Sequence, residues 1–134
     1  MPAKDKYHDT VIRALQKEGW EIISEQVRLS AARRRLWVDM QAEKSEQALV
    51  ILIEVKGFEM PSLVDYLASA VGKYVVHTAL LEVSGITTPL YMAVPLAAYQ
   101  GILSENIGLL VRRKADLKLM VFDPVSEELV TWIH

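Results

Sequence analysis

The stretch "ILIEVKGFE", residues 51–59, begins as an apolar run and ends on charged residues followed by a glycine. Side chains two residues apart on a strand point to the same face, so Glu54 and Lys56 project together while Val55 points the other way, into the core. Burying unpaired charge costs several kcal/mol. We therefore expect this strand to leave the core at a place where another group neutralises its two charges.

Strand and helix patterns alternate on both sides of this stretch. The pattern predicts one helix from Asp5 or His8 to Glu18, a second over residues 62–83 and a third from Pro95 to about Ser104. Strands are predicted at residues 20–24, 36–40, 48–56, 90–94, 117–123 and 128–133, with the polar segment 41–47 as a hairpin connection. This order indicates a single α/β domain over residues 1–134, with a mixed central sheet flanked by helices.

Length and composition exclude several classes of protein. The chain has 134 residues, is 51% hydrophobic and carries a net charge of −2, which suits one compact domain and argues against a protein that coats nucleic acid nonspecifically. It has no cysteine, so zinc-thiolate sites and thiol nucleophiles are excluded. The amino-terminal segment "MPAKDKYHDT" has no apolar region typical of a signal peptide, and charged residues interrupt residues 63–83. We expect a cytoplasmic protein without a membrane span.

An aspartate precedes Glu54 by a distance that a hairpin can close. Asp39 lies on the strand before, so the two carboxylates and the Lys56 ammonium are expected to share a small volume. Paired carboxylates repel unless a cation compensates them, and Mg²⁺ or Mn²⁺ suits an all-oxygen set. Such a metal site at Asp39 and Glu54, with Lys56 positioning a water, predicts phosphodiester hydrolysis. The simplest alternative is a cross-strand ion pair at a sheet end.

Other residues have a structural interpretation beside the functional one. Residues 33–35, three consecutive arginines, either follow a DNA backbone or form a solvated edge that prevents unwanted strand pairing, and we favour the edge. His77 lies inside the apolar helix, and we interpret it as a core histidine outside the site. The tryptophans fit core and edge packing. The wide apolar surface of the 62–83 helix fits either a central buried helix or a homodimer interface.

The set formed by Asp39 and the tripeptide Glu54-Val55-Lys56 resembles the PD-(D/E)xK nuclease superfamily. That resemblance implies a restriction-endonuclease-like core. It also implies that the first helix contributes an additional acid, for which Asp5 and Asp9 are the candidates with His8 between them. A polar residue on the helix after the Glu-x-Lys strand supports the site in related nucleases, and Lys73 occupies this region here.

A longer resemblance covers nearly the full chain. The blocks "MPAKDKYHDTVIRALQKEGW", "IEVKGF", "GKY", "LYMAVPLAAY" and "LMVFD" are similar to the XisH-type proteins of cyanobacteria, the fdxN-element excision controlling factors. The resemblance implies a role in programmed, site-specific excision of a DNA element, with a recombinase system and a small XisI-type protein as partners. Two functions remain open: a DNA endonuclease, or a non-catalytic factor that uses this fold to bind a partner or DNA.

Overall fold

A computed structural model describes residues 4–31 and 33–134. One six-stranded sheet has the order β1-β2-β3-β4-β5-β6. Its strands are β1 (Glu21–Ala31), β2 (Arg34–Lys44), β3 (Leu49–Val55), β4 (Leu90–Pro95), β5 (Leu119–Asp123) and β6 (Glu128–Ile133). The central pairs β3–β4 and β4–β5 are parallel, and the outer pairs are antiparallel. The predicted mixed α/β sheet is confirmed.

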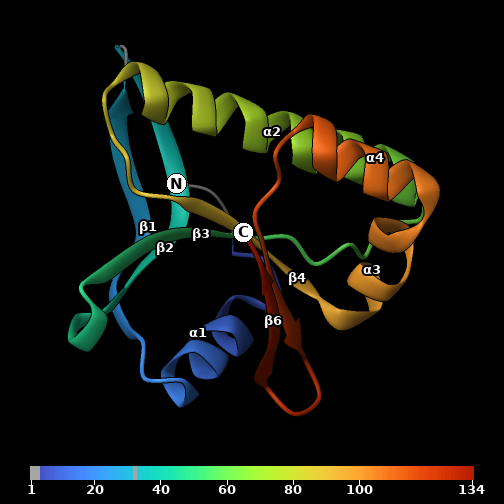
Figure 1. Cartoon of the computed structure of the whole chain (residues 1–134), viewed down its shortest axis with the longest axis horizontal. Coiled ribbons are helices and arrows are strands. Elements are labelled where there is room, and N and C mark those ends of the chain that lie inside the picture. Colours follow the sequence, from blue (N-terminus) through green and yellow to red (C-terminus); the bar gives the residue numbers. More distant parts are fainter. Residues whose placement is uncertain (1–3, 32) are drawn as a thin grey trace.

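Helices cover both faces of the sheet. Helix α1 (His8–Lys17) lies on one face, and α2 (Leu63–Val83), α3 (Leu96–Gln100) and α4 (Asn106–Lys114) lie on the other (Figure 1). Short 3₁₀ turns occupy Ser45–Gln47 and Ile102–Ser104. None of the helices within the described residues is both long enough and apolar enough to cross a membrane.

The alternation of side chains along β3 gives the sheet its two cores. Ile53 and Val55 pack in the cluster that contains Val11 and Leu15 of α1. Leu52 packs in the other cluster, with residues of α2. Because side chains alternate along a strand, Glu54 faces the α2 side, as Leu52 does. The carboxyl-terminal end of β3 therefore presents the Glu54 carboxylate to α2.

The predicted hairpin between β2 and β3 is confirmed, but its loop was predicted too long. Residues 41–44 continue β2 instead of forming the connection, and Lys44 pairs with Leu49. The turn is the 3₁₀ segment followed by Ala48, which adopts a left-handed conformation with φ of 51°. In "QAEK", residues 41–44, Ala42 is buried and its polar neighbours are partly exposed, as in a strand with one buried face. The polar composition of this segment made it resemble a loop in the sequence.

The helix predicted from Pro95 to Ser104 is broken in the structure. Helix α3 ends at Gln100, a 3₁₀ turn follows, and a separate helix α4 starts at Asn106. Sequence patterns missed α4 because its one buried residue is Gly108, which adds no apolar side chain to a helical stripe. A Cβ at Gly108 would lie 2.7 Å from the Cα of Leu103.

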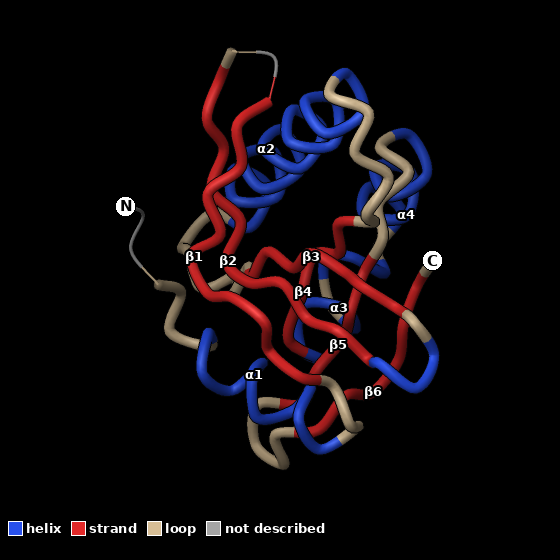
Figure 2. The backbone as a smooth tube through the Cα atoms, turned by 90° about the vertical axis from the view of Figure 1, so that its left-hand side faces the viewer, coloured by secondary structure: helices blue, strands red, loops and turns tan. Residues whose placement is uncertain are grey.

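The outer ends of β1 and β2 extend beyond the rest of the sheet. Pairing of β2 with β3 ends at Met40 and Ile53, whereas its pairing with β1 continues to Ala31 and Arg34. This two-stranded extension, residues 27–31 and 33–38, is called the β1–β2 arm below. Figure 2 shows the arm projecting beside α2.

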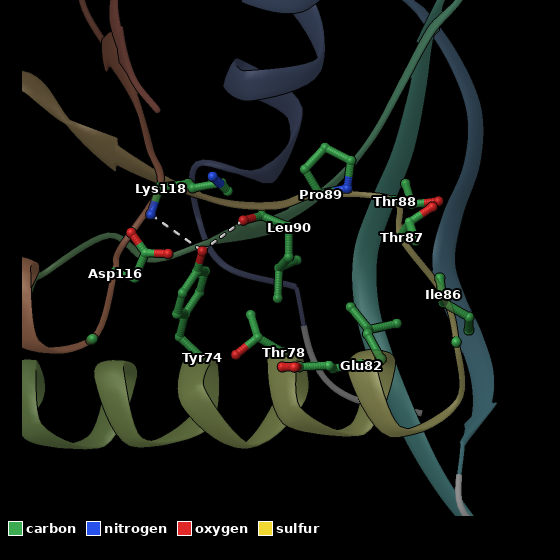
Figure 3. A pocket seen from close by; sticks show the side chains of 13 residues that line it. Tyr74, Thr78, Glu82, Ile86, Thr87, Thr88, Pro89, Leu90, Asp116 and Lys118 are labelled. Atoms are coloured by element: carbon green, nitrogen blue, oxygen red, sulfur yellow. Dashed lines mark hydrogen bonds between the residues drawn. The ribbon is translucent and has the colours of Figure 1, made fainter.

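A buried tyrosine connects α2 to the sheet. The Tyr74 hydroxyl donates a hydrogen bond to the Leu90 carbonyl oxygen at 2.8 Å and accepts one from the Lys118 backbone N–H at 3.2 Å (Figure 3). Burial raises the pKa of the Tyr74 hydroxyl, which the Lys118 N–H partly offsets. Together these bonds fix the middle of α2, one turn before His77, against β4 and β5.

Candidate active site

The end of β3 opens into a pocket of about 270 Å³ between β2, β3 and α2. Its lining includes all three residues that the sequence placed together, Asp39, Glu54 and Lys56. The remaining lining residues are Arg35, Leu36, Trp37, Lys73 and His77. The antiparallel β2–β3 pairing and the proximity of α2 thus gather two carboxylates, three cationic side chains and an imidazole.

Glu54 lies at the buried end of this pocket, with only 4% of the residue exposed. Its Oε1 is hydrogen-bonded to Nδ1 of His77. Its Oε2 is buried and has no hydrogen-bond partner among the described residues. A buried carboxylate oxygen without a partner is costly and uncommon in folded proteins. A cation or a hydrogen-bond donor bound at this position would satisfy it.

Asp39 is held in place by the neighbouring strand. Its Oδ2 accepts a hydrogen bond of 2.7 Å from the backbone N–H of Val55. Burial raises the pKa of the Asp39 carboxyl, the Val55 hydrogen bond opposes that rise, and the Glu54 carboxylate adds to it. Positive charge on His8 or Lys56 lowers the same pKa. Asp39 is therefore close enough to both Glu54 and Lys56 for their charges to act on it.

Three cationic side chains surround the carboxylates. Lys56 follows β3 directly, and its backbone N–H donates to the Ala93 carbonyl oxygen at 2.9 Å, which continues the β3–β4 pairing. Lys73 lies on α2 and Arg35 on β2, and both are exposed. None of the three forms an ion pair with a carboxylate in residues 4–31 and 33–134. They remain free to bind an anionic ligand.

His77 lies in the pocket, whereas the sequence interpretation placed it outside the site. It is four residues after Lys73, so the two side chains share one face of α2. The His77 side chain is 21% exposed and binds Glu54 on the opposite wall. A sequence signal existed in this Lys-x-x-x-His spacing. It was obscured because α2 is apolar around most of its circumference.

The residues proposed from the first helix do not line the pocket that contains Glu54. His8 is buried and its Nε2 lies 2.9 Å from Oε1 of Glu25 on β1. Asp9 is exposed and lies 3.8 Å from Lys4. Asp5, the open alternative, accepts hydrogen bonds from the backbone N–H groups of Tyr7 and Gly57, so it anchors the segment after Lys56. His8 is the one whose charge acts on Asp39.

A second group of possible metal ligands lies on α1 and β1. Ligand atoms of His8, Asp9 and Glu25 lie within 4.8 Å of one another. Glu25 and Asp9 are exposed, and His8 Nδ1 has no hydrogen-bond partner among the described residues. Metal-bound imidazoles usually donate their other N–H to an acceptor, so this set lacks the support that a metal site normally has.

A larger pocket lacks the chemistry of the Glu54 pocket. This pocket of about 530 Å³ opens between the end of α2 and the loops before β4 and β5 (Figure 3). Thr78, Glu82, Asp116 and Lys118 line it. Among the described residues, no carboxylate oxygen in this pocket is buried without a partner. It therefore shows no site built for a cation.

The family model described as XisH protein matches residues 1–130. The chain belongs to the XisH family. A crystal structure of an XisH family protein from Nostoc punctiforme PCC 73102 has 27% sequence identity and a TM-score of 0.88, and the match covers 97% of this chain and 100% of that one. An fdxN element excision controlling factor protein from Anabaena variabilis has 27% identity and a TM-score of 0.89, with 98% and 100% covered. No curated protein sequence gives a significant match.

The pocket of this XisH family member fits a hard divalent cation. Mg²⁺ and Mn²⁺ bind through one or two carboxylates and keep several waters, so Asp39 and Glu54 are sufficient protein ligands. The unpartnered Oε2 of Glu54 supplies a free ligand atom inside the pocket. The adjacent cations suit a phosphate as the remaining ligand. Residues and pocket are therefore consistent with the predicted metal.

Proposed function

We propose that this XisH family member is a metal-dependent DNA nuclease of the PD-(D/E)xK type that controls the excision of a DNA element. The observation that carries the proposal is the buried, unpartnered Oε2 of Glu54 in a pocket shared with Asp39 and Lys56. The pair with His77 occupies only Oε1, so Oε2 is left for a further ligand. The description of the Anabaena variabilis relative as an fdxN element excision controlling factor supports the biological setting.

The arrangement of elements supports the superfamily assignment. Asp39 lies on β2, Glu54 and Val55 end the adjacent antiparallel strand β3, and Lys56 follows directly. The next helix, α2, faces the same pocket. This is the placement expected for a restriction-endonuclease-like core with the Glu-x-Lys residues at the end of a central strand. The short loop between β2 and β3 fixes the register, and Asp39 and Glu54 adjoin the last paired residues, Met40 and Ile53.

Each polar side chain has a role in hydrolysis of a phosphodiester. Mg²⁺ or Mn²⁺ at Asp39 and Glu54 would supply Lewis acidity toward the phosphate and lower the pKa of a bound water. The Lys56 ammonium donates hydrogen bonds to the attacking water or to a phosphate oxygen, where negative charge grows in the transition state. Lys73 binds another phosphate oxygen as a positioning residue. His77 holds the Glu54 carboxylate in one orientation.

The direct test is nicking of supercoiled and branched DNA with Mg²⁺ or Mn²⁺. The parent protein is expected to nick, and Lys56→Ala to lose about 100-fold or more in rate, as expected when a group acting on the transition state is removed. Lys114→Ala, an exposed lysine on α4, is the matched control. No nicking by the parent with either metal would eliminate the nuclease. Equal nicking rates for Lys56→Ala and the parent would eliminate Lys56 and this pocket as the site of cleavage.

A second candidate function is a non-catalytic factor that binds a XisI-type protein. Large apolar side chains are exposed on the outer helices, which is unusual for an isolated domain. They include Val64, Val75 and Val76 on α2 and Leu109 and Leu110 on α4. The same surface would serve a homodimer.

Co-purification with a XisI-type protein tests whether this apolar surface binds a partner protein. Val76 is 57% exposed, so Val76→Asp is expected to leave the fold intact while reducing retention of the partner at least tenfold. Val130→Asp, at a 49% exposed site on β6, is the control. Light scattering of the protein alone tests for the dimer. If Val76→Asp changes neither partner retention nor molecular mass, these α2 residues form no interface.

A further inference from the structure

The β1–β2 arm differs in charge from the rest of the chain. The segment that spans it, residues 27–38, "VRLSAARRRLWV", contains four arginines and no acidic residue. With a net charge of −2 for the chain and +4 for this segment, the remainder carries −2 − 4 = −6. A polyanion is attracted to the arm and repelled by much of the remaining surface.

The arginines of the arm are available to a ligand. Arg28, Arg33, Arg34 and Arg35 are all exposed. None forms an ion pair with a carboxylate in the described parts of the chain. Surface arginines that only protect a sheet edge do not need to be grouped on both strands of one hairpin. This grouping favours recognition over edge protection, which was the interpretation from the sequence alone.

The strand register divides the arm into two faces. Val27, Leu29 and Leu36 pack with the apolar cluster that includes α2. The opposite face carries Arg28 with its cross-strand partner Trp37, and Ser30 with its partner Arg35. Cross-strand partners and alternate residues share a face, so one outward surface combines two arginines and an aromatic ring.

This outward face leads into the candidate active site. Arg35 and Trp37 lie two residues apart on β2, and Asp39 follows two residues later on the same strand. All three line the pocket that contains Glu54. Arg28 adjoins Trp37 on the neighbouring strand but does not line that pocket. The arm and the pocket thus share Arg35 and Trp37, so a DNA backbone bound at the pocket would lie next to the arm.

We propose that the outward face of the β1–β2 arm, with Arg28, Arg35 and Trp37, binds the DNA backbone next to the Glu54 pocket, supported by Arg33 and Arg34 at the arm's end. The inference rests on the proposed function for the identity of the polyanion. A two-stranded antiparallel ribbon has the size that a DNA groove accommodates. The guanidinium groups supply bidentate contacts to phosphate, which explains arginine in place of lysine.

Measuring DNA binding under conditions that prevent cleavage tests the role of the arm separately from hydrolysis. Anisotropy of a fluorescein-labelled DNA duplex is measured in EDTA over a series of NaCl concentrations. Arg28→Gln/Arg34→Gln removes two arm charges and leaves every pocket residue in place. We expect at least tenfold weaker binding at low salt. The slope of log K against log salt should fall in magnitude by about 1.8, or about 0.9 for each lost phosphate contact.

The control is Arg113→Gln/Lys114→Gln, which removes two exposed charges from α4. It is expected to bind within about twofold of the parent, since its charges lie outside the arm. Equal weakening in both double variants, or an unchanged salt slope in the arm variant, overturns the inference. Loss of nicking in Lys56→Ala with normal binding in EDTA supports the nuclease independently, so failure of either proposal is recognisable.

Discussion

Asp39 on β2 accepts a 2.7 Å hydrogen bond from the backbone N–H of Val55 on β3. This bond crosses between the strands just beyond the last paired residues, Met40 and Ile53. It places the Asp39 carboxylate beside Glu54, so two acids occupy the end of one hairpin. The position has a cost in stability, because burial and the neighbouring charge both raise the Asp39 pKa.

The raised pKa predicts how stability changes with pH. An acid whose pKa is higher in the folded state favours folding below its unfolded pKa, near 3.8, and this contribution is lost as pH rises through the folded-state value. Asp39→Asn keeps an oxygen acceptor for Val55 and removes the charge. In EDTA it should be more stable than the parent at neutral pH, with the difference vanishing in acid. Urea denaturation across pH measures this, and a less stable Asp39→Asn at neutral pH would contradict it.

Metal binding should stabilise the parent through both carboxylates. At a free Mn²⁺ or Mg²⁺ concentration about 100 times the dissociation constant, the gain is about 2.7 kcal/mol. Thermal unfolding with and without metal should show this gain in the parent and its loss in Glu54→Gln and Asp39→Asn. Glu25→Gln tests the alternative ligand set with His8 and Asp9, and should retain the gain. Loss only in Glu25→Gln would move the metal site to α1 and β1.

His77 is expected to stabilise the fold through Glu54. Removing the imidazole in His77→Ala leaves both Glu54 oxygens buried without a partner, which costs about 1–3 kcal/mol. The neighbouring Thr78→Ala should change stability by less than about 0.5 kcal/mol.

A double-mutant cycle with Glu54→Gln separates this interaction from general damage. Coupling between His77 and Glu54 of about 0.5–3 kcal/mol is expected from urea denaturation of the four proteins. Additive effects of the two substitutions would show that the imidazole and the carboxylate do not act together.

Two glycines should respond in opposite directions to alanine. A Cβ at Gly72 in α2 meets nothing within 4 Å, so Gly72→Ala should stabilise by about 0.5–1 kcal/mol through helix propensity. A Cβ at Gly108 would overlap the Ile102 carbonyl oxygen and the Leu103 backbone, so Gly108→Ala should cost about 1–3 kcal/mol or more. Guanidinium denaturation of both variants checks the pair. Equal shifts would mean that α4 is not seated on the 3₁₀ turn.

Sequence patterns were sufficient where neighbours along the chain decide the structure. The apolar run into Glu54 and Lys56 predicted a core strand with its charges at one end. Gly19 marks the end of the first helix and Ser62 the start of the second, where the Ser62 side chain accepts a hydrogen bond from the Asp65 backbone N–H at 3.3 Å. Short-range conformational preferences and periodicity determine such features, so they can be read without knowledge of the fold.

Other features depended on contacts between distant parts of the chain. The position of α4 follows from the close approach that Gly108 permits, and apolar periodicity cannot report a contact made by a glycine. The extent of the β1–β2 arm depends on where β3 stops pairing with β2. The relation of Arg28 to Trp37 depends on cross-strand register, which the sequence of either strand alone does not specify.

The amino-acid sequence by itself determined the order of the six strands and the positions of α1 and α2, because hydrophobic periodicity acts locally. Resemblance of several sequence blocks pointed to the family, and residue spacing singled out Asp39, Glu54 and Lys56 as candidates. Only the tertiary structure decided that His77 binds Glu54, that one Glu54 oxygen has no partner among the described residues, and that Asp5 anchors the segment after Lys56. These contacts form because α2 and the amino-terminal segment pack against the sheet. They join residues far apart in the chain, so local sequence patterns do not specify them.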